Sequence, residues 1–210
     1  MYKNVIKRLL DIILSVMALI VLALPLIFVA LLIKIDDPGP ALFFQKRVGK
    51  KENGEITYFQ LAKFRTMKMS TPHDVPTHQL ENPQQYITKV GKFLRKTSLD
   101  ELPQLLNILS GKMSFIGPRP ALWNQYDLIE EREKYSANDI LPGLTGWAQI
   151  NGRDELEIPV KAKLDGDYAA KLSFAMDVKC FFGTITAVLK KEGVVEGGTG
   201  ELNRNKTDEK

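Results

Sequence analysis

The chain has 210 residues, of which 44% are hydrophobic and 26% are charged, and its formal net charge is +4. This length favours one compact domain with an appendage over two full domains. The composition excludes a wholly disordered chain. One cysteine and two histidines exclude a disulfide scaffold and argue against a Cys/His zinc site.

The positive charge is concentrated at the N-terminus. Residues 1–34 contain four basic side chains and one aspartate, which accounts for +3 of the total of +4. A basic segment beside an apolar one is typical of proteins that meet anionic lipid. We therefore expect the chain to bind a membrane surface and not nucleic acid.

Residues 12–33 form an apolar run in which Ser15 is the only polar side chain. As one straight helix the run would measure about 33 Å, slightly more than the hydrocarbon core of a bilayer. Basic residues flank it on both sides, which conflicts with the positive-inside rule for a spanning helix. Pro25, near the middle, favours a bend. Two interpretations stay open: a re-entrant helix-break-helix with both flanks in the cytoplasm, and a proline-kinked spanning helix.

Asp11 is the acid beside this run, and a carboxylate at the centre of a bilayer is costly. We expect it near the interface, in an ion pair with Lys7 or Arg8, four and three residues before it. Binding of a lipid head group by the same basic cluster is the functional alternative.

Breakers at 36–40 end the helix, and residues 41–44 and 56–61 are predicted strands. Lys63 and Arg65 follow the second strand two residues apart, so both cations are expected on one face. Residues 69–85 are predicted to be a polar excursion in which neither His73 nor His78 has a role.

A short helix is predicted at 102–109, where leucines at 102, 105, 106 and 109 have the spacing of a buried face. Ser98 and Glu101 have the form of a capping box at its start, although Asp100 is the cap if Pro103 occupies the first turn. In both cases Asp100 and Glu101 lie at a helix N-terminus, where the dipole stabilises their ionised forms. A purely structural role for the two acids stays open beside a catalytic one.

Two Gly- and Pro-rich loops follow, at 111–120 and 142–153. Arg119 lies between two prolines in the first loop, and Arg153 ends the second. Such loops can bind phosphate through backbone N–H groups, although neither has the form of a nucleotide-binding fingerprint.

Residues 172–189 are predicted to form an amphipathic helix with basic ends, which either packs on the core or lies in the membrane interface. Cys180, within it, is expected to be a small buried hydrophobic side chain. Residues 194–210 are polar and Gly-rich and are expected to form a flexible tail.

Taken together, these motifs resemble the bacterial sugar transferase family, the small monotopic polyprenyl-phosphate phosphoglycosyl transferases. The similarity extends over residues 3–193 in the family's order. One position departs from the pattern, because the family's helix break is Ser-Pro and Leu24 precedes Pro25 in this chain. The matching stretches are Lys7-Arg8 with Asp11, PGP at 38–40, FFQKRVG at 43–49, KFRTM at 63–67, SLDELPQL at 98–105, MSFIGPRP at 113–120 and PGLTGWAQINGR at 142–153.

The resemblance implies a mixed, irregular α/β fold, with a re-entrant membrane helix at 1–36, a small cytoplasmic catalytic domain with amphipathic interfacial helices at 37–193 and the tail at 194–210. It implies transfer of a phospho-sugar from a UDP-sugar to polyprenyl (undecaprenyl) phosphate, with release of UMP and a requirement for Mg²⁺. The implied setting is the cytoplasmic face of the bacterial inner membrane, at the first membrane step of a glycoconjugate pathway, with downstream glycosyltransferases as candidate partners.

The resemblance also implies residue roles. Asp100 is the implied covalent nucleophile, Glu101 is its partner, and both acids are implied Mg²⁺ ligands. Pro25 is the implied membrane break. The cations implied to bind or position phosphate are Lys63, Arg65, Arg95, Arg119 and Arg153.

Two other functions remain as alternatives. A membrane-bound nucleotide-sugar hydrolase could use the same acid pair to activate water. A non-enzymatic membrane module could bind anionic lipid or nucleic acid through its basic residues in a salt-sensitive way. The sequence identifies neither the sugar nor the oligomeric state.

Overall fold

A computed structural model of the chain describes residues 2–71, 82–152 and 155–190. In this part of the chain the fold is a mixture of helices and strands, as predicted, and the strands form two small sheets. His73, His78, Arg153 and the segment 194–210 lie outside the described residues. The α-helices are α1 (Lys7–Asp36), α2 (Lys89–Thr97), α3 (Gln104–Leu109), α4 (Tyr126–Glu133), α5 (Trp147–Ile150), α6 (Ile158–Ala170) and α7 (Phe174–Lys190). The strands are β1 (Leu42–Glu52), β2 (Glu55–Phe64), β3 (Ser114–Ile116) and β4 (Gly143–Thr145). A short π-helix, η1 (Tyr2–Ile6), precedes α1, and the 3₁₀ helices are η3 (Pro83–Tyr86), η4 (Leu99–Glu101) and η5 (Ala137–Asp139).

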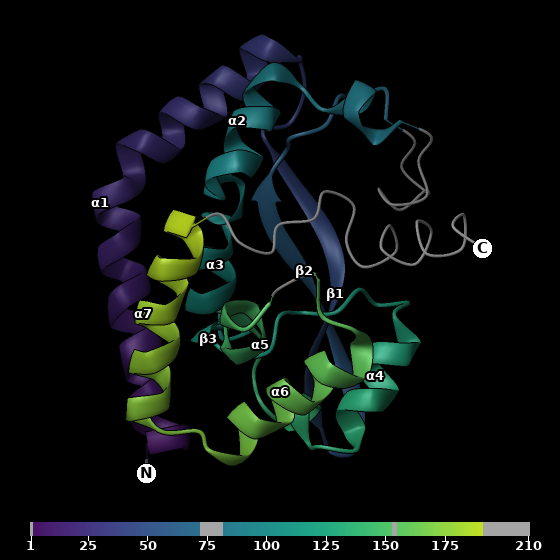
Figure 1. Cartoon of the computed structure of the whole chain (residues 1–210). Coiled ribbons are helices and arrows are strands. Elements are labelled where there is room, and N and C mark those ends of the chain that lie inside the picture. The colour runs from purple at the N-terminus through teal and green to yellow at the C-terminus, as the bar shows by residue number, and fades with distance from the viewer. Residues whose placement is uncertain (1, 72–81, 153–154, 191–210) are drawn as a thin grey trace, which may run out of the picture.

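The apolar run and its flanks form α1, one continuous helix of 30 residues that includes Pro25. Its inner side packs on the domain through Leu19 and Leu22. Its outer side exposes large apolar side chains, such as Ile20 at 71% and Leu24 at 79%. Figure 1 shows α1 running along one side of the molecule and then bending over toward α2. The predicted helix-break-helix is not confirmed, because a proline removes one helical hydrogen bond and the helix continues on both sides of it.

In the described residues, α1 is the one helix that is long and apolar enough to cross a membrane. Both of its ends are nevertheless bound to the same domain. The Arg8 guanidinium donates to the carbonyls of Ile108 and Leu109, at the end of α3, at 2.6 and 2.8 Å. At the other end, the Asp36 carboxylate accepts the amide of Val90 on α2 at 2.9 Å. The two ends of α1 are therefore hydrogen-bonded to α3 and α2, two helices of the same domain.

The predicted ion pair of Asp11 with Lys7 or Arg8 is wrong. The Lys7 ammonium contacts the carboxylate of Asp177 on α7 at 2.6 Å. Asp11 accepts the Ser114 hydroxyl at 3.1 Å and the Phe115 amide at 3.0 Å. Lys7 and Asp11 are both buried, because they lie on the side of α1 that faces the domain, where other elements supply partners. The basic cluster with its aspartate thus attaches α1 to the domain.

β1 and β2 pair as an antiparallel hairpin. Its turn is Asn53-Gly54, with φ of 52° and 85°, a pair of residues that tolerates positive φ in two-residue hairpins. The predicted strands at 41–44 and 56–61 are present but longer than expected. The polar residues 45–52 continue β1 because pairing with β2 satisfies their backbone groups whatever their side chains.

The two Gly- and Pro-rich loops, predicted separately, pack against each other through the parallel strands β3 and β4. The Gly117 amide donates to the Thr145 carbonyl at 2.8 Å. A Cβ atom at Gly143 or Gly146 would lie 2.1 Å from backbone atoms of Gly117, so only glycine allows this approach. The contact between the loops fixes the start of the segment that carries Arg119.

The predicted C-terminal helix is confirmed as α7, which begins beside the N-terminal end of α1 (Figure 1). Its inner side packs on the core through Cys180, which is fully buried as predicted. Its outer side exposes Phe174, Phe181 and Phe182, each more than half exposed. Packing on the core is therefore confirmed. Contact of the exposed aromatic side with the membrane interface stays a prediction.

Candidate active site

The two candidate catalytic acids lie in η4, a single 3₁₀ turn between α2 and α3. The predicted helix is confirmed as α3, but it begins at Gln104, after the acids, with Pro103 at its N-cap. The predicted capping box is wrong, because Ser98 ends α2 in a left-handed conformation (φ 57°) and its side chain makes no capping hydrogen bond. Asp100 and Glu101 are thus presented by a turn and not by the first turn of α3.

α3 anchors this turn on the β1–β2 hairpin. Leu105 and Ile108 are buried in one cluster with Phe59 and Leu61 of β2. Leu106, predicted to be buried, is 48% exposed, because α3 has only six residues and covers the hairpin with one narrow side. The hairpin therefore supports α3 and the turn before it, which carries the acids.

Arg119 reaches the acids from the first Gly- and Pro-rich loop. Its guanidinium contacts both carboxylate oxygens of Glu101, Nη2 to Oε1 at 2.5 Å and Nη1 to Oε2 at 3.3 Å. This is the two-point geometry in which arginine holds carboxylates and phosphates. The Arg119 side chain is still 42% exposed, so it orients Glu101 and remains accessible to a ligand.

Two further arginines hold the backbone around Arg119. Arg132 on α4 donates to the Arg119 carbonyl, and Arg47 on β1 donates to the Pro120 carbonyl, each at 3.0 Å. Arg132 is paired in turn with Asp165 on α6, where its Nε and Nη2 both donate to Oδ2 at 2.9 and 2.5 Å. Side chains from β1, α4 and α6 therefore fix the position from which Arg119 reaches Glu101.

Lys63 and Arg47, both half-buried, add positive charge beside the acids. Burial lowers the pKa of Lys63 to about 8, with the charge of Arg47 adding to this effect and that of Asp100 opposing it. Burial and, to a smaller extent, the charge of Arg119 lower the pKa of Arg47 to about 10. The buried Arg47 Nε–H has no hydrogen-bond partner among the described residues. The site therefore holds more positive charge than its two acids neutralise.

Asp100 is itself half-buried. Burial, and then the charge of Glu101, raise the pKa of Asp100 to about 6, against the lowering effect of the surrounding cations. The predicted stabilisation of its ionised form by a helix dipole is wrong, because one 3₁₀ turn has a small dipole and burial dominates. At neutral pH a carboxyl group with this pKa is still mostly ionised.

The remaining predicted cations fall in different places. Arg95 donates to the Thr66 hydroxyl at 2.9 Å and interacts electrostatically with Asp100. Arg65 is bound elsewhere: it pairs with Asp37 and donates to the Pro40 carbonyl at 2.8 Å, which closes the segment after α1. Lys63 and Arg65, predicted on one face, have different partners, since Lys63 interacts with Asp100 and Arg65 with Asp37. Arg153 lies outside the described residues.

The acid pair is also the candidate metal site. No group of three or more His, Cys, Asp or Glu side chains gathers in residues 2–71, 82–152 and 155–190. Mg²⁺ commonly binds through one or two carboxylates together with substrate phosphates and water. Asp100 and Glu101 fit such a partial ligand set, to be completed by a diphosphate.

Comparison with known proteins decides the family. The family described as "Bacterial sugar transferase" matches residues 2–191. The chain belongs to the bacterial sugar transferase family. The resemblance inferred from the motifs is confirmed, and with it the predicted class of enzyme, a phosphoglycosyl transferase.

Members of the bacterial sugar transferase family with similar sequences occur in several bacteria. The exopolysaccharide production protein PSS of Rhizobium leguminosarum bv. phaseoli is 41% identical over 89% of this chain and 96% of its own length. The uncharacterized sugar transferase EpsL of Bacillus subtilis is 36% identical over 90% of each chain. The UDP-glucose:undecaprenyl-phosphate glucose-1-phosphate transferase of Escherichia coli is 39% identical over 87% of this chain and 40% of its own length.

Sequence reasoning missed Arg47 and the Arg132–Asp165 pair of this sugar transferase. Arg47 had a signal: if the first strand is extended to Glu52, alternation puts Arg47 on the face that also carries Lys63. Arg132 and Asp165 had none, because charged side chains on helices usually face solvent.

Proposed function

We propose that the protein transfers a phospho-sugar from a UDP-sugar to polyprenyl phosphate, such as undecaprenyl phosphate, and releases UMP. The observation that carries this proposal is the acid pair of η4 in its setting of arginines and a lysine. Both substrates carry phosphate, so a site for this reaction needs cations around its nucleophile. The relatives from E. coli and Komagataeibacter xylinus are named as undecaprenyl-phosphate glucose-phosphate transferases.

Asp100 is the proposed nucleophile. One of its carboxylate oxygens attacks the phosphorus that carries the sugar, the bond from this phosphorus to the bridging oxygen breaks, and UMP leaves with that oxygen. An oxygen of polyprenyl phosphate then attacks the same phosphorus, and the bond to Asp100 breaks to restore the carboxylate. A pKa of about 6 supports the role, because the group is ionised at neutral pH and poorly solvated.

The neighbouring side chains have separate proposed roles. Arg119 is the candidate to bind the diphosphate, because its half-exposed fork can contact two phosphate oxygens. The positive charges of Lys63 and Arg47 offset the repulsion between the Asp100 carboxylate and the diphosphate. Glu101 is held by Arg119 and keeps its charge beside Asp100.

Mg²⁺ is the proposed cofactor, held by Asp100 and Glu101 together with substrate oxygens. Bound there, it would neutralise charge on the diphosphate and on the departing UMP. We expect EDTA to abolish transfer and added Mg²⁺ to restore it. Activity that survives removal of divalent ions would contradict this assignment.

The decisive experiment for the covalent step omits the lipid acceptor. Enzyme with Mg²⁺ and a UDP-sugar labelled in the sugar should release up to one UMP per active site and retain the label on the Asp100 peptide. Asp100→Asn should retain no label and lose at least about 10³-fold in turnover. Glu131→Gln removes a carboxylate that pairs with Lys134 on the surface of α4 and serves as the matched control, with an unchanged burst.

Other outcomes of this experiment support other mechanisms. UMP release that depends strictly on the acceptor, without labelled enzyme, would contradict the covalent step and make Asp100 a general base. Sugar phosphate released into water without a lipid product would indicate the hydrolase. Binding to anionic vesicles without consumption of any UDP-sugar would indicate the non-enzymatic module. The same assay over UDP-glucose, UDP-galactose and their N-acetyl forms identifies the sugar.

We propose further that α1 is re-entrant and that the domain lies on the cytoplasmic face of the bacterial inner membrane. The hydrogen bonds at both ends of α1 support this topology. A spanning helix would place its ends on opposite sides of about 30 Å of hydrocarbon, and a domain bound to both ends cannot follow. The apolar outer sides of α1 and α7 are the surfaces offered to lipid.

Cysteine labelling tests this topology. Lys3→Cys and Glu52→Cys, each in a Cys180→Ser background, should resist an impermeant thiol reagent in intact cells and react after lysis. Both positions are exposed, so lack of reaction in cells reports the membrane and not burial. Labelling of one position alone in intact cells would establish a spanning helix.

A further inference from the structure

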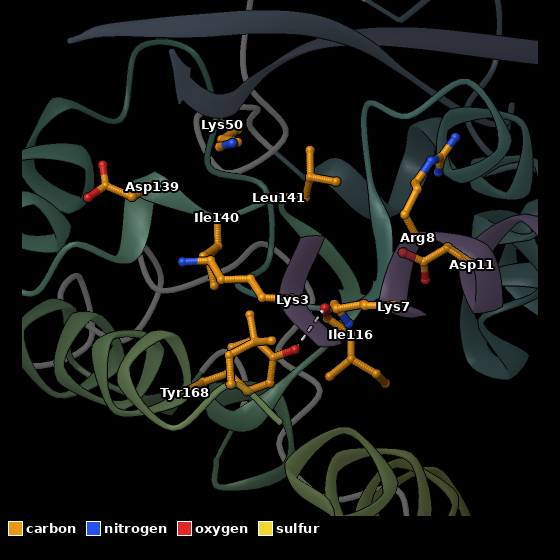
Figure 2. A pocket seen from close by; sticks show the side chains of 11 residues that line it. Lys3, Lys7, Arg8, Asp11, Lys50, Ile116, Asp139, Ile140, Leu141 and Tyr168 are labelled. Atoms are coloured by element: carbon orange, nitrogen blue, oxygen red, sulfur yellow. Dashed lines mark hydrogen bonds between the residues drawn. The ribbon is translucent and has the colours of Figure 1, made fainter. Parts of the chain in front are cut away.

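A cavity of about 350 Å³ opens at the N-terminal end of α1, away from the acid pair. None of the residues around Asp100 and Glu101 lines it. Lys3 on η1, three residues of α1, Lys50 on β1 and the segment 139–141 form its wall, with Tyr168 on α6 (Figure 2). A cavity of this size is within the range that holds small organic ligands.

Basic side chains dominate the charge of this cavity. Four cations line it, Lys3, Lys7, Arg8 and Lys50, against the carboxylates of Asp11 and Asp139. Lys7 is neutralised by Asp177, a carboxylate of α7 outside the lining. With that carboxylate included, the cavity keeps one positive charge in excess.

The excess charge is carried by side chains without a protein partner. In the described part of the chain, neither the Lys3 nor the Lys50 ammonium forms an ion pair or a hydrogen bond, whereas Arg8 is held by two carbonyls. Figure 2 shows both lysines on the side of Ile140 and Asp139, opposite Arg8 and Asp11. Two like charges brought to one concavity from distant parts of the chain favour a bound anion.

The rest of the wall is apolar, with side chains of Ile116, Ile140, Leu141 and Leu172. The cavity also lies beside the exposed apolar surface, since Val5 and Leu9 next to its basic residues are 60% and 55% exposed. A ligand that suits this wall has one negative charge and an organic substituent. A phosphate diester has both properties.

We infer that this cavity is a second anion site, which binds a phosphate group, free or esterified, through Lys3 and Lys50 and is separate from the transfer reaction. A phospholipid head group and a soluble phosphate share this chemistry. Because the lysines come from η1 and β1, the ligand bridges the N-terminal end of α1 to the hairpin. Its binding therefore stabilises the folded protein.

The test measures thermal stability of the full chain in dodecyl maltoside, without UDP-sugar, so its result does not depend on the proposed transferase reaction. The probes are dihexanoyl-phosphatidylglycerol, dihexanoyl-phosphatidylcholine and inorganic phosphate at constant ionic strength. We expect phosphatidylglycerol to raise Tm and phosphatidylcholine to have no effect. In Lys3→Gln/Lys50→Gln the half-saturating concentration should rise by at least about fivefold, the effect of one lysine at an anionic lipid surface.

The control is Lys68→Gln/Lys163→Gln, which removes the same charge from two exposed lysines outside the cavity and should respond like the wild type. If inorganic phosphate reproduces the Tm rise and the cavity variant loses it, the site takes soluble phosphate. If phosphatidylglycerol alone acts, the site takes a lipid head group. An equal Tm rise in all three proteins, or no rise with any anion, would overturn the inference.

Discussion

Two arginine–carboxylate pairs involve the loop that carries Arg119, and they differ in exposure to solvent. The side chains of Arg119 and Glu101 are 42% and 20% exposed, whereas those of Arg132 and Asp165 are 4% and 1% exposed. The buried pair holds the backbone carbonyl of Arg119 and can reach no ligand. The exposed pair includes Glu101, one of the two candidate catalytic acids, and it can contact a ligand. Burial, and not the chemistry of the residues, separates positioning from binding.

The largest expected effect is on the stability contributed by the buried pair. Arg132→Met leaves the Asp165 carboxylate buried without its cation, and we expect the free energy of unfolding to fall by about 3–5 kcal/mol. Urea denaturation in detergent, followed by tryptophan fluorescence, measures the change. Arg132→Met/Asp165→Leu should recover most of this stability, because it removes both charges.

The double variant also separates positioning from stability. It removes the donor to the Arg119 carbonyl, so kcat should remain well below that of the wild type although the protein is stable. Full recovery of both properties would show that the buried pair has no positioning role.

The exposed pair should show the reverse pattern. Glu101→Gln removes the charge beside Asp100, and we expect turnover to fall by at least about 10²-fold. The free energy of unfolding should change by less than about 1 kcal/mol, as for other exposed pairs. Steady-state kinetics and the same denaturation assay test the two parts, and a variant destabilised as strongly as Arg132→Met would contradict the comparison.

Asp100 extends the comparison to pH. Its pKa in the folded protein is raised from 3.8 to about 6, so ionisation opposes folding and this destabilisation grows as pH rises from about 4 to 6. In EDTA, Asp100→Asn should therefore be about 1–3 kcal/mol more stable than the wild type at pH 7. The difference should vanish near pH 4, where the carboxyl group is protonated in both states. A difference independent of pH would show that Asp100 is not desolvated.

The smallest expected effect concerns the shape of the cation in the exposed pair. Arg119→Lys keeps the charge but loses the two-point fork, and we expect kcat/KM to fall by about tenfold. Arg47→Lys, which loses the contact to the Pro120 carbonyl, should act in the same direction and serves as a second probe of this loop. Unchanged kinetics in Arg119→Lys would assign Arg119 to structure.

The accuracy of the sequence predictions follows the range of the interactions involved. α1, α3 and α7 were predictable because apolar spacing along one helix is a local property. The partners of Lys7 and Asp11 were not, since Asp177 and Ser114 come from distant parts of the chain. The raised pKa of Asp100 was likewise missed, because burial depends on tertiary packing and cannot be read from the sequence of η4 itself.

By itself, the sequence determined the apolar helix with Pro25, the acid pair Asp100–Glu101, the arginine between two prolines and, through its motifs, the family. These features depend on residue type and short spacing. Only the tertiary structure decided which cations meet the acids: it brought Lys63, Arg47, Arg95 and Arg119 together and bound Arg65 to Asp37. The physical reason is that electrostatic partnership depends on distance and burial in space, which packing of the hairpin, the loop and η4 sets.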